Sequence, residues 1–103
     1  MPTQKDILTF LTNIKPQLQK NGIEQVGLFG SYARNSATLT SDIDIVIKLN
    51  KNYLDKNDVW NYFNEINKIK EMVYDKFQIK SDVFDLDSAS SLKDKIEKEV
   101  LYV

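Results

Sequence analysis

The sequence contains no cysteine and no histidine among its 103 residues. Without cysteine, the chain cannot form a disulfide, a thiolate nucleophile or a cysteine-based zinc site. Without histidine, it lacks the most common general base, the histidine-activated serine and cysteine nucleophiles, and the most common ligand of transition metals. Any catalysis must therefore rely on carboxylates, which favour hard cations such as Mg²⁺ bound through oxygen.

An excess of charge of one sign is also missing. Lysine and arginine total 14, aspartate and glutamate total 15, and the net charge is −1. A protein that holds nucleic acid through its phosphates normally carries a basic excess or a basic stripe, so we expect no direct contact with polymeric nucleic acid. The first residues lack the apolar core of a signal peptide, and no segment could span a bilayer. We therefore expect a cytoplasmic protein without a membrane partner.

The length and composition fit one domain that spans residues 1–103. A chain of this size can bury a single hydrophobic core but is too short for two. The apolar fraction of 42% and the charged fraction of 28% are ordinary for a globular protein. The two prolines and three glycines are scattered, and no repeat or linker separates one part of the chain from another.

Hydrophobic periodicity predicts three helices. The first follows the cap residue Thr3, should be kinked or shortened by Pro16, and ends at 21–22, where glycine accepts a left-handed conformation. The second is long and is capped by Asp58. The last follows residues 88–91. Apolar side chains at helical spacing on the long helix are Val59, Phe63, Ile66, Ile69 or Lys70, Val73 and Phe77.

Short apolar runs predict strands at 23–29, 41–49 and 79–86. A turn, with room for one helical turn, separates the first two strands. The resulting order predicts an α+β (mixed α/β) domain, in which helices pack on a small sheet. Residues 101–103 either dock onto this domain or form part of an interface. The aromatic residues 60, 62 and 74 on the long helix belong to the core or face a partner.

The strand at 41–49 carries a pair of acids. Side chains two positions apart on a strand share a face, so Asp42 and Asp44 should project together from one surface of the sheet. The alternating isoleucines must then form the buried face. Two neighbouring ionised carboxylates repel each other unless a cation lies between them. A divalent metal removes that cost, and two metals can stabilise both the attacking and the leaving oxygen of a displacement at phosphorus.

The turn after the first predicted strand suits a phosphate group. Gly30 would let a phosphate approach the backbone closely, and Ser31 adds a hydroxyl donor. Arg34 is the only arginine of the chain and either clamps a triphosphate or pairs with a surface carboxylate. The turn is not a Walker A loop, because no lysine follows its second glycine.

These residues together resemble a known signature. Gly30-Ser31, ten further residues and then Asp42-Ile43-Asp44 are similar to the GS-x10-DxD signature of the DNA polymerase β-like nucleotidyltransferase superfamily. The longer runs 28–34 and 41–47 resemble the short MNT proteins, which are the antitoxin half of HEPN/MNT toxin–antitoxin pairs. The ending of the chain is also similar to theirs, so the resemblance covers nearly the whole sequence.

The resemblance implies a minimal nucleotidyltransferase fold and a specific reaction. In that family a Mg²⁺-dependent enzyme, with two metal ions, transfers AMP from ATP to a tyrosine hydroxyl of a partner HEPN ribonuclease toxin and thereby acts as its antitoxin. Carried over by position, Gly30, Ser31 and Arg34 would bind the nucleotide. Asp42 and Asp44 would hold the metals, and an aspartate of the third strand would complete the catalytic set.

The third carboxylate remains open on periodicity alone. Asp82, Asp85 and Asp87 all lie near the third predicted strand, and the latter two fall on the face opposite Asp82. The resemblance favours Asp82 as a metal ligand and as the group that helps to deprotonate the acceptor. The chain departs from many relatives at Asn35, where they place a glycine, and this change could alter the loop.

Two other functions compete with the adenylylation of a partner. The chain could be an antitoxin that neutralises its toxin by binding alone, with vestigial nucleotide chemistry. It could also transfer a nucleotide to the hydroxyl of a small molecule, although enzymes of that kind normally carry an additional helical domain for the acceptor. The sequence does not indicate the preferred base, the number of nucleotides transferred or the stoichiometry of a complex.

Overall fold

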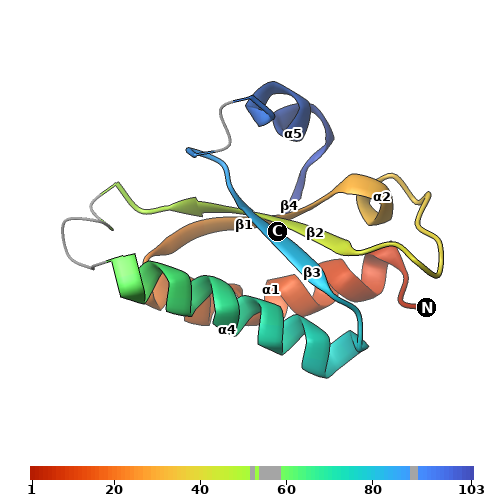
Figure 1. Ribbon diagram of the computed structural model, residues 1–103, viewed down its shortest axis with the longest axis horizontal. Coiled ribbons are helices and arrows are strands. Elements are labelled where there is room, and N and C mark those ends of the chain that lie inside the picture. The colour runs from red at the N-terminus through yellow and green to blue at the C-terminus, as the bar shows by residue number, and fades with distance from the viewer. Residues whose placement is uncertain (52, 54–58, 89–90) are drawn as a thin grey trace.

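The computed structural model describes residues 1–51, 53, 59–88 and 91–103 (Figure 1). Its elements in chain order are α1 (Gln4–Lys20), β1 (Ile23–Phe29), α2 (Gly30–Ala33), β2 (Ile43–Leu49), α4 (Val59–Phe77), β3 (Ser81–Asp85), α5 (Lys93–Glu99) and β4 (Leu101–Tyr102). This arrangement confirms the predicted class, a small mixed α/β domain with helices packed on a sheet. None of the helices formed by the described residues is long and apolar enough to cross a membrane.

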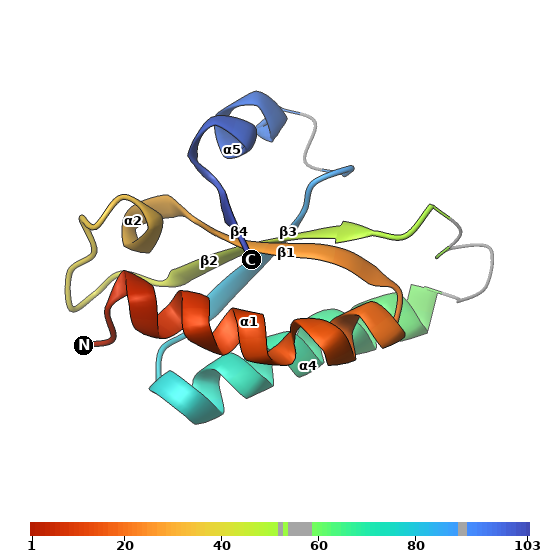
Figure 2. The same ribbon diagram turned by 180° about the vertical axis from the view of Figure 1, so that it is seen from behind.

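The strands form one sheet in the order β3-β2-β1-β4. β1 pairs antiparallel with β2 and with β4, whereas β2 and β3 run parallel. A parallel pair needs a crossover connection, which α4 supplies. Helices α1 and α4 cover one face of the sheet, and α2 and α5 lie on the other (Figures 1 and 2).

The predicted isoleucine row is the centre of the main core. Ile43, Ile45 and Ile47 are fully buried between the sheet and the two long helices. A second cluster lies on the opposite face, where Val46 and Ile96 of α5 are fully buried against Phe29 and Leu86. The sequence analysis did not predict this second cluster. Because α5 covers part of the face that carries the acids, only one end of that face is left for a site.

Helix α1 begins and ends as predicted, and it continues through the proline that was expected to kink or shorten it. Thr3 and Asp6 form a reciprocal capping box at its start, and Asn21 is its final cap. The helix continues through Pro16 to Lys20, so the expectation that proline would shorten it was wrong. Proline removes one backbone hydrogen bond of the helix. The buried leucines on both sides of the proline, at 11 and 18, hold the helix on the sheet despite this loss.

The end of the chain adds a strand that the sequence analysis did not predict. Leu101 and Tyr102 pair with β1, and the backbone N–H of Val103 donates to the carbonyl of Val26 at 3.1 Å. Residues 101–103 therefore dock onto the domain. Strands β2 and β3 are shorter than the predicted ranges 41–49 and 79–86. The predicted cap at Asp58 lies outside the described residues.

Helix α4 buries one face and exposes several aromatic side chains. Ile69 and Val73 are fully buried, as their spacing predicts. Phe63, which the same spacing placed on the buried stripe, is 52% exposed and packs edge-on against the ring of Tyr62. Two further aromatic residues of this helix, Trp60 and Tyr74, are 76% and 53% exposed.

Candidate functional site

Three neighbouring strands bring the predicted turn and two of the predicted acids together. Asp44 of β2 lies opposite Phe29 of β1 on one side and opposite Asp82 of β3 on the other. Gly30 directly follows Phe29 and begins α2. Adjacent strands are about 4.8 Å apart, so Asp44 lies between the glycine turn and the third-strand acid.

Close packing makes a side chain at Gly30 incompatible with this arrangement. The backbone of Gly30 has a φ of +77°, a conformation that residues with a Cβ atom rarely adopt. A Cβ atom built at this position would overlap the Oδ2 atom of Asp44. The glycine therefore both forms the turn and leaves room for the carboxylate, and the sequence analysis had predicted only a close approach of phosphate.

The carboxyl group of Asp44 has an unusual proton affinity. Its pKa is raised to about 6, chiefly by burial and then by the carboxylates of Asp82 and Asp42. The guanidinium of Arg34 acts in the opposite direction and lowers the pKa. Charges shift a pKa in this way only over short distances, so these groups share one electrostatic site. A carboxyl group with a pKa perturbed by both burial and like charge is a typical feature of a functional site.

Asp42 is held less firmly than the sequence predicted. β2 begins at Ile43, so the strand ladder fixes Asp44 but not Asp42, which is exposed. Within the described part of the chain, no three acids converge closely enough to form a ready-made metal centre. The chemistry of the donors still fits a hard cation, since carboxylate oxygens suit Mg²⁺ and a cation would relieve the charge repulsion at Asp44.

The positions of the competing third-strand acids distinguish their roles. Asp82 shares the face of Asp44 through the parallel register. Asp85 comes three positions after Asp82, so its side chain lies on the opposite face of the strand. It accepts a hydrogen bond from the hydroxyl of Tyr62 of α4 at 3.2 Å. Asp87 follows the strand and is exposed. Asp85 therefore links the strand to the helix that covers the opposite face, whereas Asp82 faces the glycine turn and Asp44.

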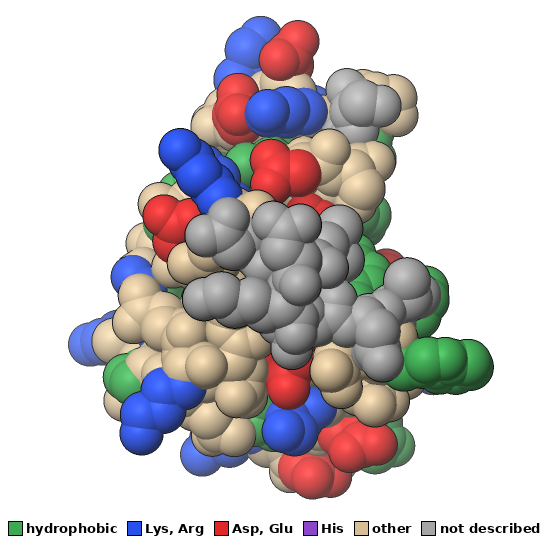
Figure 3. Space-filling view, turned by 90° about the vertical axis from the view of Figure 1, so that its left-hand side faces the viewer, with side chains coloured by type: hydrophobic (Ala, Val, Ile, Leu, Met, Phe, Trp, Pro, Cys, Tyr) green, Lys and Arg blue, Asp and Glu red, His purple; other side chains and the backbone are tan. Residues whose placement is uncertain are grey.

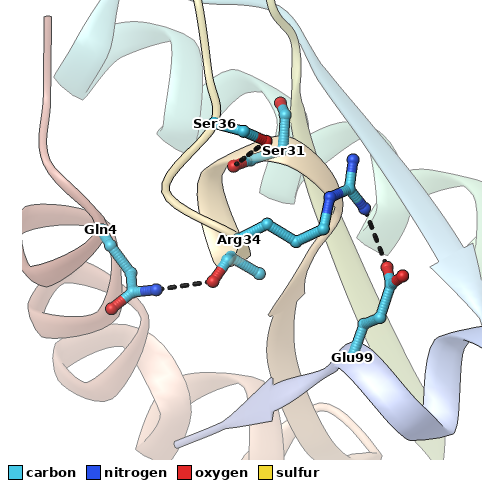
Figure 4. Close-up of polar contacts among 6 residues, drawn as sticks. Gln4, Ser31, Arg34, Ser36 and Glu99 are labelled. Atoms are coloured by element: carbon cyan, nitrogen blue, oxygen red, sulfur yellow. Dashed lines mark hydrogen bonds and ion pairs between the residues drawn. The ribbon is translucent and has the colours of Figure 1, made fainter.

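Arg34 lies beside the site but is paired with a residue that the sequence analysis did not single out. Its Nη1 atom lies 2.8 Å from Oε2 of Glu99, at the end of α5 (Figure 4). Both side chains are partly exposed, so the ion pair contributes little to stability. No sequence signal links residues 65 positions apart, and the contact arises because α5 folds back over the same sheet face.

The short helix α2 is fastened at both ends. The Nε2 atom of Gln4 donates to the carbonyl of Ala33 at 2.6 Å, which ties the end of α2 to α1 (Figure 4). The backbone N–H of Ser36 donates to the carbonyl of Ser31 at 2.9 Å. Asn35, between these contacts, has a φ of +59°. Asparagine tolerates this left-handed conformation better than most residues, so it can stand at a position of the loop that would also suit glycine.

We expect substitutions at Asn35 to separate backbone conformation from side-chain chemistry. Asn35→Gly should change the free energy of unfolding by no more than a few tenths of a kcal/mol, because glycine also accepts a positive φ. Asn35→Val should destabilise the protein by about 1–2 kcal/mol, because its branched Cβ is strained there. Urea unfolding of the three proteins would measure the difference. Equal stability of the valine and glycine variants would contradict a left-handed loop.

The molecular surface carries charges of both signs. On the face shown in Figure 3, basic and acidic side chains alternate, and no broad patch of one sign forms. This mixture agrees with the net charge of −1.

Comparisons with known proteins match the same fold. Residues 12–103 match the family model described as "Polymerase beta, Nucleotidyltransferase". A protein of Methanocaldococcus jannaschii, provisionally named a protein adenylyltransferase, is 31% identical over 111 aligned positions that cover 100% of both chains.

Two solved structures are similar in fold at low sequence identity. The first, provisionally named a minimal nucleotidyltransferase, has a TM-score of 0.72 at 16% identity and covers 97% of this chain and 95% of its own. The second is a crystal structure of a toxin–antitoxin with AMP-PNP, with a TM-score of 0.62 at 23% identity, covering 88% of this chain and 69% of its own. The fold, the family model and the full-length relative agree, and the chain belongs to the polymerase β nucleotidyltransferase family.

Proposed function

We propose that this nucleotidyltransferase transfers AMP from ATP to a tyrosine hydroxyl of a partner HEPN ribonuclease toxin and so acts as its antitoxin. The observation that carries the proposal is the position of Asp44, packed against Gly30 on one side and in register with Asp82 on the other. This places a phosphate-compatible turn and two carboxylates around one point. The full-length relative named as a protein adenylyltransferase supports transfer to a protein.

On the donor side, Gly30 and Ser31 are the residues proposed to bind the triphosphate. The glycine leaves its backbone accessible, and the serine is partly exposed at the start of α2. Arg34 is close enough to affect the pKa of Asp44, so its guanidinium can reach phosphate oxygens after it leaves Glu99. A structurally similar toxin–antitoxin was crystallised with the ATP analogue AMP-PNP, which supports ATP as the donor.

Asp42, Asp44 and Asp82 are the residues proposed to hold Mg²⁺, as two ions. Bound Mg²⁺ would neutralise charge on the phosphate oxygens and polarise the reacting phosphorus. The protein itself supplies oxygen ligands of the hard type that Mg²⁺ requires. Because Asp42 precedes the strand, it can move toward its neighbours without any change in the sheet.

The acceptor reaction needs a base and an open approach. The tyrosine oxygen attacks the α-phosphorus, the bond from that phosphorus to the pyrophosphate oxygen breaks, and pyrophosphate leaves. Asp82 is exposed at the start of β3 and is the carboxylate proposed to accept the hydroxyl proton. Exposure suits a protein acceptor, because a macromolecule must bring its tyrosine to the site.

A labelling experiment tests this proposal. The chain would be incubated with Mg²⁺, ATP labelled at the α-phosphate, and the HEPN protein that we expect the neighbouring gene to encode. We expect the label on a tyrosine of the HEPN protein and a loss of its ribonuclease activity. ATP labelled at the γ-phosphate should transfer no label, which distinguishes nucleotidyl transfer from phosphorylation.

The double variant Asp42→Asn/Asp44→Asn is the control for catalysis. It should bind the HEPN protein but neither label nor neutralise it, because the proposed metal ligands are removed. Neutralisation by this variant without any label would instead support an antitoxin that acts by binding alone. Absence of label with the wild-type chain would contradict the proposal itself.

A further inference from the structure

A groove of about 450 Å³ opens beside the candidate site, at the end of the sheet where β3 begins. Asp42 and Asp82 line one part of it. The rest of the lining comes from α4 and the start of β3 and consists of Lys70, Glu71, Tyr74, Asp75, Lys80 and Ser81. Larger hollows elsewhere are lined mainly by α1 and α4 and include none of the candidate carboxylates.

The groove contains a hydroxyl group that has no partner. Ser81 is only 8% exposed, and its Oγ atom is buried without a hydrogen-bond partner in the described structure. Buried polar groups are nearly always paired, so an unpaired one needs an explanation. Ser81 is in register with the core residue Ile43, so its side chain lies on the α4 side of β3, whereas Asp82 projects from the other face. Because β3 is an edge strand, the groove reaches both residues, and rotation of the Ser81 side chain would bring its Oγ atom to a ligand in the groove.

An exposed row of side chains on α4 leads into the same groove. We call Trp60, Phe63, Asn67, Lys70 and Tyr74 the aromatic stripe, since three of its five members are aromatic. Their spacing of three and four residues places them along one side of the helix over roughly 20 Å. Lys70 and Tyr74 belong to both the stripe and the groove. Exposed aromatic residues in such a row are typical of a surface that binds another protein.

The in-line geometry of a displacement at phosphorus places the acceptor on the groove side of Asp44. Gly30 lies on the β1 side of Asp44, and the groove lies on its β3 side. In a displacement at phosphorus, the attacking and leaving oxygens are roughly in line on opposite sides. If the pyrophosphate leaves toward Gly30, the acceptor oxygen must arrive from the side of Asp82.

We propose that the acceptor protein docks on the aromatic stripe and inserts its hydroxyl-bearing segment into this groove, where Ser81 Oγ forms a hydrogen bond with that segment. The inference rests on the proposed nucleotidyl transfer and names the surface that presents its acceptor. The stripe is longer than a small molecule, which favours a protein. The acceptor oxygen bonds to the α-phosphorus as pyrophosphate leaves, and the hydroxyl proton passes to Asp82.

Steady-state labelling of the HEPN protein tests the stripe. Trp60→Ala and Tyr74→Ala should each raise the KM for the HEPN protein roughly tenfold, as expected for exposed aromatic residues at an interface. The KM for ATP should stay within about twofold of the wild-type value, because neither residue lies on the β1 side. Tyr102→Ala is the matched control: this tyrosine is 41% exposed on β4, at the other edge of the sheet, and should change neither KM.

Ser81→Ala gives a second measurement, which distinguishes a role of Ser81 in binding the acceptor from a role in stabilising the fold. Its KM for the HEPN protein should rise roughly fivefold, because the hydrogen bond to the acceptor is lost. Its melting temperature should rise, because the free protein no longer buries an unpaired hydroxyl. A purely structural role for Ser81 would instead lower the melting temperature.

The outcomes separate this inference from the proposed function. If the wild-type chain labels the HEPN protein and the stripe and Ser81 variants keep a normal KM for it, the docking surface is wrong while the transfer stands. Equal impairment by Tyr102→Ala would also contradict the surface. If the wild-type chain transfers no label, the proposed function fails and this inference fails with it.

Discussion

Replacing Asp44 by asparagine is expected to abolish nucleotidyl transfer and, at the same time, to make the metal-free protein more stable. Transfer should fall by at least about 10³-fold, because a ligand of the proposed Mg²⁺ site, whose ions would neutralise charge on the reacting phosphate, is lost. The stability gain follows from the environment of this carboxyl group, whose pKa is raised to about 6 by burial and by the neighbouring acids Asp82 and Asp42.

The sign of the stability change depends on pH. A carboxyl group whose pKa is higher in the folded protein than in the unfolded chain binds its proton more tightly when folded. Below pH 4 the group is protonated in both states and does not lower the stability. The free energy of unfolding falls as the pH rises from 4 toward 6, and the protein stays destabilised by this amount at higher pH. Asp44 is partly exposed, and solvent reduces the full effect of the shift, so the penalty near pH 7 is about 1 kcal/mol.

Urea unfolding of the wild-type chain and of Asp44→Asn, with chelator and at several pH values, measures this effect. The variant should be more stable at pH 7–8, and the difference should vanish below pH 4. Added Mg²⁺ should stabilise the wild-type chain at pH 7.5 and have a smaller effect on the variant, because a ligand of the proposed metal site is missing. A variant that is less stable than the wild type at every pH would refute the repulsive site.

Local sequence patterns predicted most of the fold but not the contacts made by its last residues. The cap at Thr3, the isoleucine row of β2 and the succession of the first three strands along the chain follow from patterns within a few residues. β4 could not be predicted in this way, because a strand of two residues has no periodicity of its own. It forms only because β1 offers a free edge. For the same reason, the pair Arg34–Glu99 depends on where α5 folds.

The same limit applies to the predicted site, because local patterns identify candidate residues but not their contacts with distant parts of the chain. The spacing of Gly30, Asp44 and Asp82 fits a phosphate-transfer site, and the pairing of the strands brings these residues to one place. Periodicity left the third acid open, because it does not show what each acid contacts. The hydrogen bond from Tyr62 to Asp85 supplies that information. The role of these residues in catalysis remains a prediction that the Asp44 variant tests.

The second large effect is expected for Gly30→Ala, which should both destabilise the protein and impair transfer. An alanine at a φ of +77° is strained by about 1–2 kcal/mol, and overlap of its methyl group with the Asp44 carboxylate adds to this cost. We expect a total loss of about 2–3 kcal/mol. Transfer per folded molecule should fall by at least about tenfold, because a small displacement of a reacting group is costly.

Gly22→Ala is the matched control for this prediction. Gly22 also has a positive φ, of +95°, and a Cβ atom there would overlap the ring of Tyr53 instead of a candidate carboxylate. The two glycines stand at opposite ends of β1, roughly 25 Å apart. Both variants should therefore unfold at lower urea concentrations, but only Gly30→Ala should lose transfer per folded molecule. Equal activity of the two folded variants would show that Gly30 serves the backbone alone, and the close packing against Asp44 would then have no part in the reaction.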